Sequence, residues 1–288
     1  AYIADYDEGL RILNVANPAL VTSLGVYNSV GPMWSLDVAG NYAYVGTFSR
    51  GLQILDVSNP ANIIPAGAYE VADIAVDVQL VNNIAYVAFY DETLLILDVS
   101  NPTWVQRLGT YTKPGGARGL HVAGSLVCLA EESAGLEFLD ATNPADIIRL
   151  GGYRSAGEPQ DVQVVGNLAY IADGDGGLQI FDVADSSAVI PLGGYDTPGY
   201  ARDVLVVGSL AYVADGSAGL MILDISDPAA VSVVGGYDTT GAAYEVQVVG
   251  HLAYVADGTA GLQILDVSDL TDVTRLGGYN TSGTAYGV

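Results

Sequence analysis

The fold is decided by a stretch that spans 203–237 and reads DVLVVGSLAYVADGSAGLMILDISDPAAVSVVGGY. It contains four short apolar runs rich in β-branched residues, and no part of it has helical periodicity. Gly208-Ser209 suits a two-residue hairpin turn, and Asp227-Pro228 interrupts the chain after the third run. We therefore predict antiparallel strands at 203–207, 210–214, 220–224 and 231–237.

This stretch belongs to a unit of 42 residues that recurs along the whole chain. One tyrosine series follows the period, and Cys128 takes its missing place: Tyr2, Tyr44, Tyr86, Tyr170, Tyr212 and Tyr254. A second series has no exception: Tyr27, Tyr69, Tyr111, Tyr153, Tyr195, Tyr237 and Tyr279. An aspartate series follows Asn14: Asp56, Asp98, Asp140, Asp182, Asp224 and Asp266. The 288 residues fall six short of seven complete units.

Four strands in each of seven units predict an all-β fold, a seven-bladed β-propeller that forms one domain over 1–288. The chain starts at the second strand of a unit, and 284–288 match the first strand of the next unit. We therefore expect the C-terminal strand to join the N-terminal blade and close the ring. Because Ala1 begins abruptly in a strand, we also expect the chain to be part of a longer protein.

The third strand and the turn after it share a recognisable sequence motif. Residues 51–60 read GLQILDVSNP, and 94–102 and 219–228 are close variants of it. This motif resembles the LVIVD repeat of bacterial and archaeal surface-associated propellers. The resemblance covers essentially the whole chain and implies a propeller fold, often in an extracellular setting. It implies no catalytic motif and no particular ligand.

The composition excludes several classes of function. There are 33 acidic and 9 basic residues, and the resulting net charge of −24 repels nucleic acid and anionic membranes. No apolar run is long enough to span a membrane. The negative electrostatic field of the chain favours cations, basic proteins or neutral glycans as partners. The composition favours an extracellular or cell-surface location. Cys128 lies in an apolar strand, where we expect it to be buried and unreactive. The oligomeric state is left open.

Residues that every blade repeats are predicted to be structural. We expect the Asp56 series to accept backbone N–H bonds in the turn that follows each third strand. Calcium binding by this series is the alternative. The two tyrosine series are expected to pack between neighbouring blades.

Residues that break the repeat are candidates for binding. The turns between second and third strands, and the loops from each fourth strand to the next blade, should share one rim. Aromatic residues gather there, together with arginines and acidic residues such as Asp5, Asp173, Asp215 and Asp257. The alternatives are that the aromatics fold inward and that the arginines only neutralise an acidic rim. The candidate contact residues are Tyr6, Trp34, Phe48, Arg50, Phe89, Tyr90, Arg118, Arg202 and Tyr244.

One position on the first strand carries four carboxylates near the mouth of the channel: Asp77, Asp161, Asp203 and Glu245. Converging carboxylates are ligands for a cation such as Ca²⁺. The alternative is that each one accepts hydrogen bonds from loop backbone or from a nearby arginine. No cofactor other than this possible Ca²⁺ is indicated.

Catalysis has little support from the sequence. His121 and His251 are the only histidines, and neither has an identifiable nucleophile or zinc partner. We therefore expect a non-enzymatic binding or scaffolding propeller that presents its rim to a protein or a glycan. The alternatives are a purely structural module of a surface protein, and a polysaccharide hydrolase or lyase that uses the carboxylates at the channel mouth.

Overall fold

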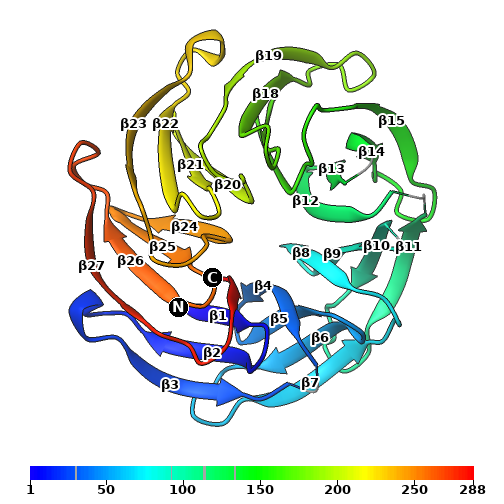
Figure 1. Cartoon of the computed structure of the whole chain (residues 1–288). Helices are drawn as coiled ribbons and strands as arrows, with labels where there is room; N and C mark the ends of the chain where they lie inside the picture. The colour runs from blue at the N-terminus through cyan, green and yellow to red at the C-terminus, as the bar shows by residue number, and fades with distance from the viewer. Residues whose placement is uncertain (30, 92, 113–114, 133) are drawn as a thin grey trace.

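The structure, a computed structural model, describes residues 1–29, 31–91, 93–112, 115–132 and 134–288. These residues form seven four-stranded antiparallel sheets arranged as a ring of blades (Figure 1). Only two short 3₁₀ helices interrupt the described strands, η1 (Pro18–Leu20) and η2 (Pro228–Ala230). No helix in the described part of the chain is long and apolar enough to cross a membrane. The predicted seven-bladed propeller is confirmed.

The blades follow one another in chain order. Blade 1 contains β28 (Ala285–Gly287), β1 (Tyr2–Asp5), β2 (Gly9–Asn14) and β3 (Thr22–Tyr27). Blade 2 contains β4 (Met33–Ala39), β5 (Tyr42–Thr47), β6 (Gly51–Asp56) and β7 (Ile64–Tyr69). Blade 3 contains β8 (Ala75–Val81), β9 (Ile84–Phe89), β10 (Thr93–Asp98) and β11 (Gln106–Tyr111). Blade 4 contains β12 (Ala117–Ala123), β13 (Leu126–Glu131), β14 (Gly135–Asp140) and β15 (Ile148–Tyr153).

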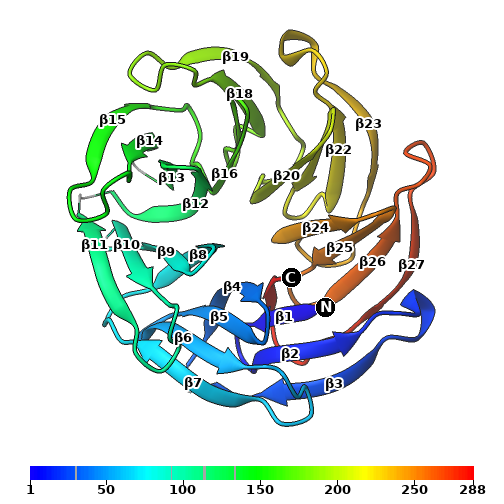
Figure 2. The same cartoon turned by 180° about the vertical axis from the view of Figure 1, so that it is seen from behind.

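The last three blades have the same pattern. Blade 5 contains β16 (Asp161–Val165), β17 (Leu168–Ala172), β18 (Leu178–Asp182) and β19 (Ile190–Tyr195). Blade 6 contains β20 (Asp203–Val207), β21 (Leu210–Ala214), β22 (Leu220–Asp224) and β23 (Ser232–Tyr237). Blade 7 contains β24 (Glu245–Val249), β25 (Leu252–Ala256), β26 (Leu262–Asp266) and β27 (Thr274–Tyr279). The first strand of each blade faces the central axis and the fourth lies at the perimeter, from either side of the ring (Figures 1 and 2).

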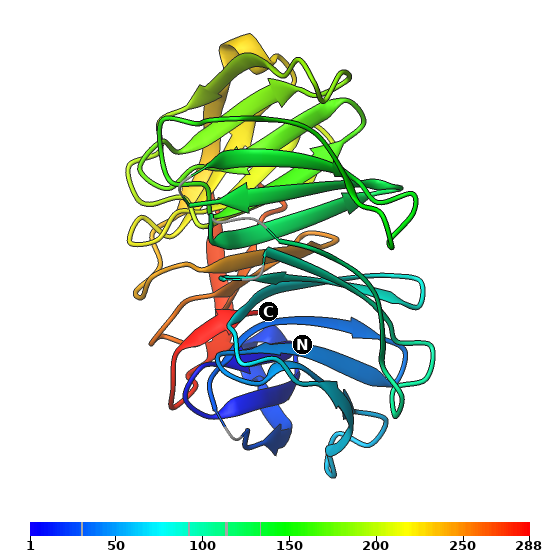
Figure 3. The ribbon, with the colours of Figure 1, turned by 90° about the vertical axis from the view of Figure 1, so that its right-hand side faces the viewer.

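The ring closes through the two ends of the chain. Strand β28 pairs with β1, where Ala4 faces Gly287 and Asp5 faces Ala285. The Tyr6 N–H also donates to the carbonyl of Thr284 at 2.8 Å. The two termini lie near each other in both face-on views and in the side view of the ring (Figures 1 to 3). The predicted closure is confirmed.

The core lies between neighbouring blades. Each hydrophobic cluster joins residues of two adjacent sheets, and Tyr44, Tyr86, Tyr170 and Tyr212 are each buried in one of them at 5% exposure. Cys128 is fully buried beside Phe138, and burial raises the pKa of its thiol. The expected packing role of the first tyrosine series and the burial of Cys128 are confirmed.

The turn after each third strand has the predicted local hydrogen bond. The Ser58 N–H donates to Asp56 Oδ1 at 2.9 Å, and the Ser226 N–H donates to Asp224 Oδ1 at the same distance. Hydrogen bonds from the serine hydroxyl and backbone lower the pKa of both carboxyls. The aspartate series therefore shapes turns.

The fourth strand of each blade contains a glycine that lies directly against the turn of a neighbouring blade, a contact that the sequence analysis missed. A Cβ at Gly109 would lie 1.7 Å from the carbonyl oxygen of Pro144 in the next blade, and Gly277 makes the same approach to Pro18 across the closure. The turn of one blade therefore packs directly on the strand of another, and no larger residue fits. The series is Gly25, Gly67, Gly109, Gly151, Gly193, Gly235 and Gly277.

Candidate binding site at the channel mouth

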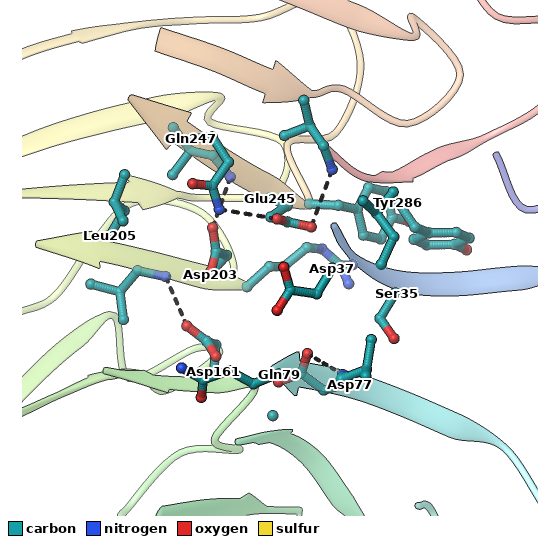
Figure 4. A pocket seen from close by; sticks show the side chains of 18 of the residues that line it. Ser35, Asp37, Asp77, Gln79, Asp161, Asp203, Leu205, Glu245, Gln247 and Tyr286 are labelled. Carbon is teal, nitrogen blue, oxygen red and sulfur yellow. Dashed lines mark hydrogen bonds between the residues drawn. The ribbon is translucent and has the colours of Figure 1, made fainter. Parts of the chain in front are cut away.

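The first strands enclose a cavity of about 910 Å³ on the axis of the ring. It is lined by residues of β4, β8, β12, β16, β20, β24 and β28, so that the seven-fold repeat places equivalent side chains around it. In the close-up, carboxyl and amide side chains from separate blades point into this common space (Figure 4). Three successive rings of side chains make up its wall.

The outermost ring, which we call the collar, is the position just before the channel carboxylates. Three aromatics occupy blades 1, 2 and 7, whereas arginines occupy blades 4 and 6. The collar is thus aromatic on one side and cationic on the other. Its members are Trp34, Val76, Arg118, Gln160, Arg202, Tyr244 and Tyr286, all of which line the cavity.

The aromatic side of the collar is one continuous stack. Trp34 lies on Tyr286 with ring centroids 4.9 Å apart and planes at 10°, and Tyr244 meets Tyr286 edge-on at 4.3 Å. Tyr6 packs edge-on against both members of the stacked pair, at 5.8 Å and 5.3 Å. Burial, together with the neighbouring Tyr244, raises the pKa of Tyr286 to about 12. All four rings remain partly exposed, so they offer a contact surface at the entrance.

The cationic side holds its two arginines differently. Arg118 forms an ion pair with Glu132 at 2.9 Å and lies 5.1 Å above the ring of Tyr90. Arg202 lies over two rings, 4.3 Å from the centroid of Tyr244 and 5.1 Å from that of Tyr200. The Tyr200 hydroxyl donates to Glu158 at 2.9 Å, and burial together with this bond raises the pKa of Tyr200 to about 12.

The second ring contains the four predicted channel carboxyls, and they bind the next blade. Asp77 Oδ2 accepts the Leu120 N–H at 2.8 Å, and Asp203 Oδ2 accepts the Val246 N–H at 2.7 Å. Asp161 and Glu245 make the same bond at 3.3 Å and 3.2 Å. Each carboxyl therefore joins its own blade to its neighbour, and the Glu245 bond to Val288 ties down the C-terminal strand.

The third ring lies two residues further along each first strand and was missed by sequence analysis. Asp37 Oδ2 accepts the Leu80 N–H at 2.8 Å, and Gln79 Oε1 accepts the Val122 N–H at 2.7 Å. These bonds also connect adjacent blades. The signal was present in the period of 42 combined with the two-residue alternation of a strand. The ring contains Asp37, Gln79, His121, Gln163, Leu205 and Gln247.

The channel carboxyls are weaker acids than ordinary carboxyl groups. Burial first, and then the charge of a neighbouring carboxyl, raises the pKa of Asp77 and of Asp203 to about 7 and that of Glu245 to about 8. Burial also raises the pKa of Asp161 well above its ordinary value, and its side chain forms a hydrogen bond with Asp203. Two carboxyls in such contact share a proton. Near neutral pH this ring therefore both donates and accepts hydrogen bonds.

The four channel carboxyls do not gather into one compact cluster of metal ligands. Within the described part of the chain, no three histidine, cysteine, aspartate or glutamate side chains come close enough together to hold one ion. Each of the four carboxyls accepts a backbone hydrogen bond, as the alternative to metal binding expects, but the donor lies on or directly after the first strand of the next blade rather than in a loop. Binding of Ca²⁺ here stays a prediction.

The predicted contact residues divide into four groups. Trp34, Arg118, Arg202 and Tyr244 belong to the collar, and Tyr6, Phe48 and Tyr90 pack against it or beside it. Arg50 is outside the cavity wall and pairs with Glu70 on the exposed surface at 2.7 Å. Phe89 requires a correction: it is fully buried among core residues of blades 2 and 3, so it offers no exposed surface.

Several acidic turn residues also differ from expectation. Asp5, Asp173, Asp215 and Asp257 are buried rather than displayed on the rim. Asp215 accepts hydrogen bonds from the Thr197 hydroxyl at 2.6 Å and the Gly199 N–H at 2.8 Å, both in the loop between β19 and β20. These carboxyls hold the loops together, because a buried carboxylate needs such partners.

Comparison with known proteins agrees with this architecture. The sequence model of the family described as LVIVD repeat matches residues 1–29, 30–71, 73–113, 156–197, 198–239 and 240–281. A search of curated proteins finds no match. The chain is similar to the crystal structure of RRP9 WD40 repeats, with a TM-score of 0.70 and 10% identity over 88% of this chain and 82% of that one. It is also similar to the computationally designed Ika8 protein, with a TM-score of 0.68 and 11% identity over 91% and 79% of the two chains. At these identities the likeness shows the fold alone.

Proposed function

We propose that this chain, which belongs to the LVIVD-repeat family, is a non-catalytic binding or scaffolding propeller that holds a protein or glycan at its collar. One observation carries the proposal. Trp34, Tyr244 and Tyr286 form a partly exposed stack at the entrance of a cavity of about 910 Å³. Aromatic side chains at a concave entrance are the usual anchors of recognition sites.

The repeating frame does not need these aromatics. At the equivalent position, blade 3 has Val76 and blade 5 has Gln160, and both blades form the same four-stranded sheet. A large aromatic at the collar therefore adds nothing that a blade requires to fold. The asymmetry supports one binding site that faces blades 7, 1 and 2 rather than seven equal sites. The acidic composition supports a place outside the cell or on its surface.

The test is partner capture by collar variants. Purified protein is used to capture labelled components of cell-surface extracts and to probe a glycan array. We expect Trp34→Ala and Tyr244→Ala to abolish capture with little change in thermal midpoint. Trp104→Ala is the matched control, because Trp104 is 68% exposed on the turn between β10 and β11 and is not part of the cavity wall. Unchanged capture by the collar variants would reject the proposal, and the absence of any reproducible binder would favour a purely structural module.

A second function is favoured by the Asp161–Asp203 pair. Two hydrogen-bonded carboxyls with raised pKa values are a possible general acid and base for a polysaccharide hydrolase or lyase. Turnover of a polysaccharide by the purified protein, lost in Asp161→Asn, would establish it. The inter-blade bonds of both carboxyls give them a structural role without catalysis, which is why the binding function ranks first.

A further inference from the structure

Arg202 is a collar residue whose guanidinium has hydrogen-bond donors without a partner in the described part of the chain. None of the ion pairs and side-chain hydrogen bonds formed by the described residues involves its guanidinium, and its Nε is buried without a hydrogen-bond partner. The other collar arginine, Arg118, pairs with Glu132. Arg202 therefore presents hydrogen-bond donors that its own chain does not use.

Arg202 differs from the other arginines that form no ion pair among the described residues. Arg107, Arg154 and Arg275 are exposed, whereas Arg202 is only partly exposed and its Nε is buried. Acidic residues outnumber basic ones by 33 to 9, and Arg11, Arg50, Arg118 and Arg149 each pair with one. Leaving a buried donor unpaired carries a free-energy cost. At Arg202 the guanidinium is held over the rings of Tyr200 and Tyr244, which orient it without using its donors strongly. The guanidinium N–H groups of Arg202 are thus held in place for a hydrogen-bond acceptor on a ligand.

The surroundings of Arg202 indicate what else the ligand carries. Beside it stand the faces and edges of partly exposed aromatic rings, on which the apolar face of a sugar ring can stack. Below it lie carboxyl and amide groups, including Gln163 and Gln247, which both donate and accept hydrogen bonds. This mixture suits a ligand with several hydroxyl groups. A planar guanidinium fork in turn suits a carboxylate.

We propose that Arg202 binds the carboxylate of an acidic sugar, a uronate residue whose ring stacks on the aromatic side of the collar. This inference rests on the proposed binding function and adds the chemical class of its ligand. The net charge of −24 opposes a polyanionic chain, so the glycan that fits is neutral apart from one uronate. A peptide carboxylate would also reach Arg202, but it lacks the ring and the hydroxyl groups that the rest of the wall accommodates.

The test compares a charged and an uncharged form of the same sugar. Binding of a short neutral oligosaccharide ending in glucuronate, and of its methyl ester, is measured by calorimetry. We expect the acid to bind at least about tenfold more tightly than the ester. Arg202→Gln should remove this preference, so that acid and ester bind with equal affinity, and Arg202→Lys should keep only part of the preference. Arg107→Gln is the control, because Arg107 is exposed on the outer strand β11.

Several results would overturn the inference. They are equal affinity for acid and ester, a preference that survives Arg202→Gln, no detectable binding of either sugar, and tighter binding of a peptide through its C-terminal carboxylate. Failure of this inference is distinguishable from failure of the binding function. If captured material still depends on Trp34 while acid and ester bind equally, the collar binds a partner but Arg202 does not select a uronate.

Discussion

From the raised pKa values of the channel carboxyls we predict that the protein loses stability as the pH rises above neutral. Asp203 is the clearest case, because burial and the nearby Glu245 raise its pKa to about 7. In the unfolded chain an aspartate titrates near pH 3.9. The folded protein therefore binds this proton more tightly than the unfolded one. The resulting stabilisation is complete below the unfolded pKa and is lost as the pH rises through about 7.

The size of the effect follows from the shift. A difference of about 3 pKa units is worth about 4 kcal/mol for one isolated group at pH 8.5 relative to pH 4. Asp77 and Glu245 act in the same direction, with pKa values of about 7 and about 8. Because the three carboxyls interact, their contributions do not add, and we expect a total loss of a few kcal/mol between pH 6 and pH 9.

The assay is urea unfolding at pH 5.5 and pH 8.5 for wild type and Asp203→Asn. The amide keeps an oxygen to accept the Val246 N–H but cannot ionise. The variant should therefore be more stable than wild type by about 4 kcal/mol at pH 8.5 and by about 2 kcal/mol at pH 5.5, where the aspartate of the unfolded chain is already ionised. Asp224→Asn is the matched control, because turn hydrogen bonds lower the pKa of Asp224 and its loss should cost stability at both pH values. Equal effects of Asp203→Asn at the two pH values, or a wild-type stability that is flat from pH 6 to pH 9, would refute the reasoning.

Three further predictions concern the frame. Gly109→Ala should lower the free energy of unfolding by about 2 kcal/mol or more, because the added methyl would lie 1.7 Å from the Pro144 carbonyl oxygen. Urea unfolding measures this loss, with Thr110→Ala at the neighbouring exposed position as the control. An equal loss of stability in both variants would contradict the prediction. Removal of 284–288 should open the ring and lower the thermal midpoint by many degrees, as measured by circular dichroism, since it deletes the strand that pairs with β1; a midpoint within two or three degrees would argue against closure by β28. Cys128 should react with a thiol reagent only after unfolding, because it is fully buried and burial raises its pKa; rapid labelling of the native protein would show that the core between blades 4 and 5 opens.

The repeat made most of the frame predictable. The period of 42 identifies equivalent positions, so the seven sheets, the closure by the C-terminal strand and the burial of the first tyrosine series all followed from it. The two-residue turn was also correct: Val207 faces Leu210, and Gly208 adopts a positive φ of 64°. Periodicity succeeds here because every blade solves the same packing problem.

The site was harder to predict because the period does not give the direction of a side chain. Phe89 ends its strand pointing into the core, whereas the next residue, Tyr90, points towards Arg118. A shift of one residue thus separates a core position from a surface one. The bonds from channel carboxyls to the next blade connect residues 43 apart, and they depend on a ring curvature that no local pattern encodes. The collar itself emerges only when single residues of seven blades are brought together.

The most direct test of the central claim uses Trp34 as a reporter. The chain has two tryptophans, so Trp104→Phe leaves Trp34, stacked on Tyr286 at the entrance of the channel, as the only one. The fluorescence of this variant is followed while a captured partner or a uronate-bearing glycan is titrated. If the collar is the binding site, the emission of Trp34 shifts and saturates with the same affinity that calorimetry measures. Saturable binding that leaves the emission of Trp34 unchanged would place the ligand elsewhere on the propeller and contradict the account.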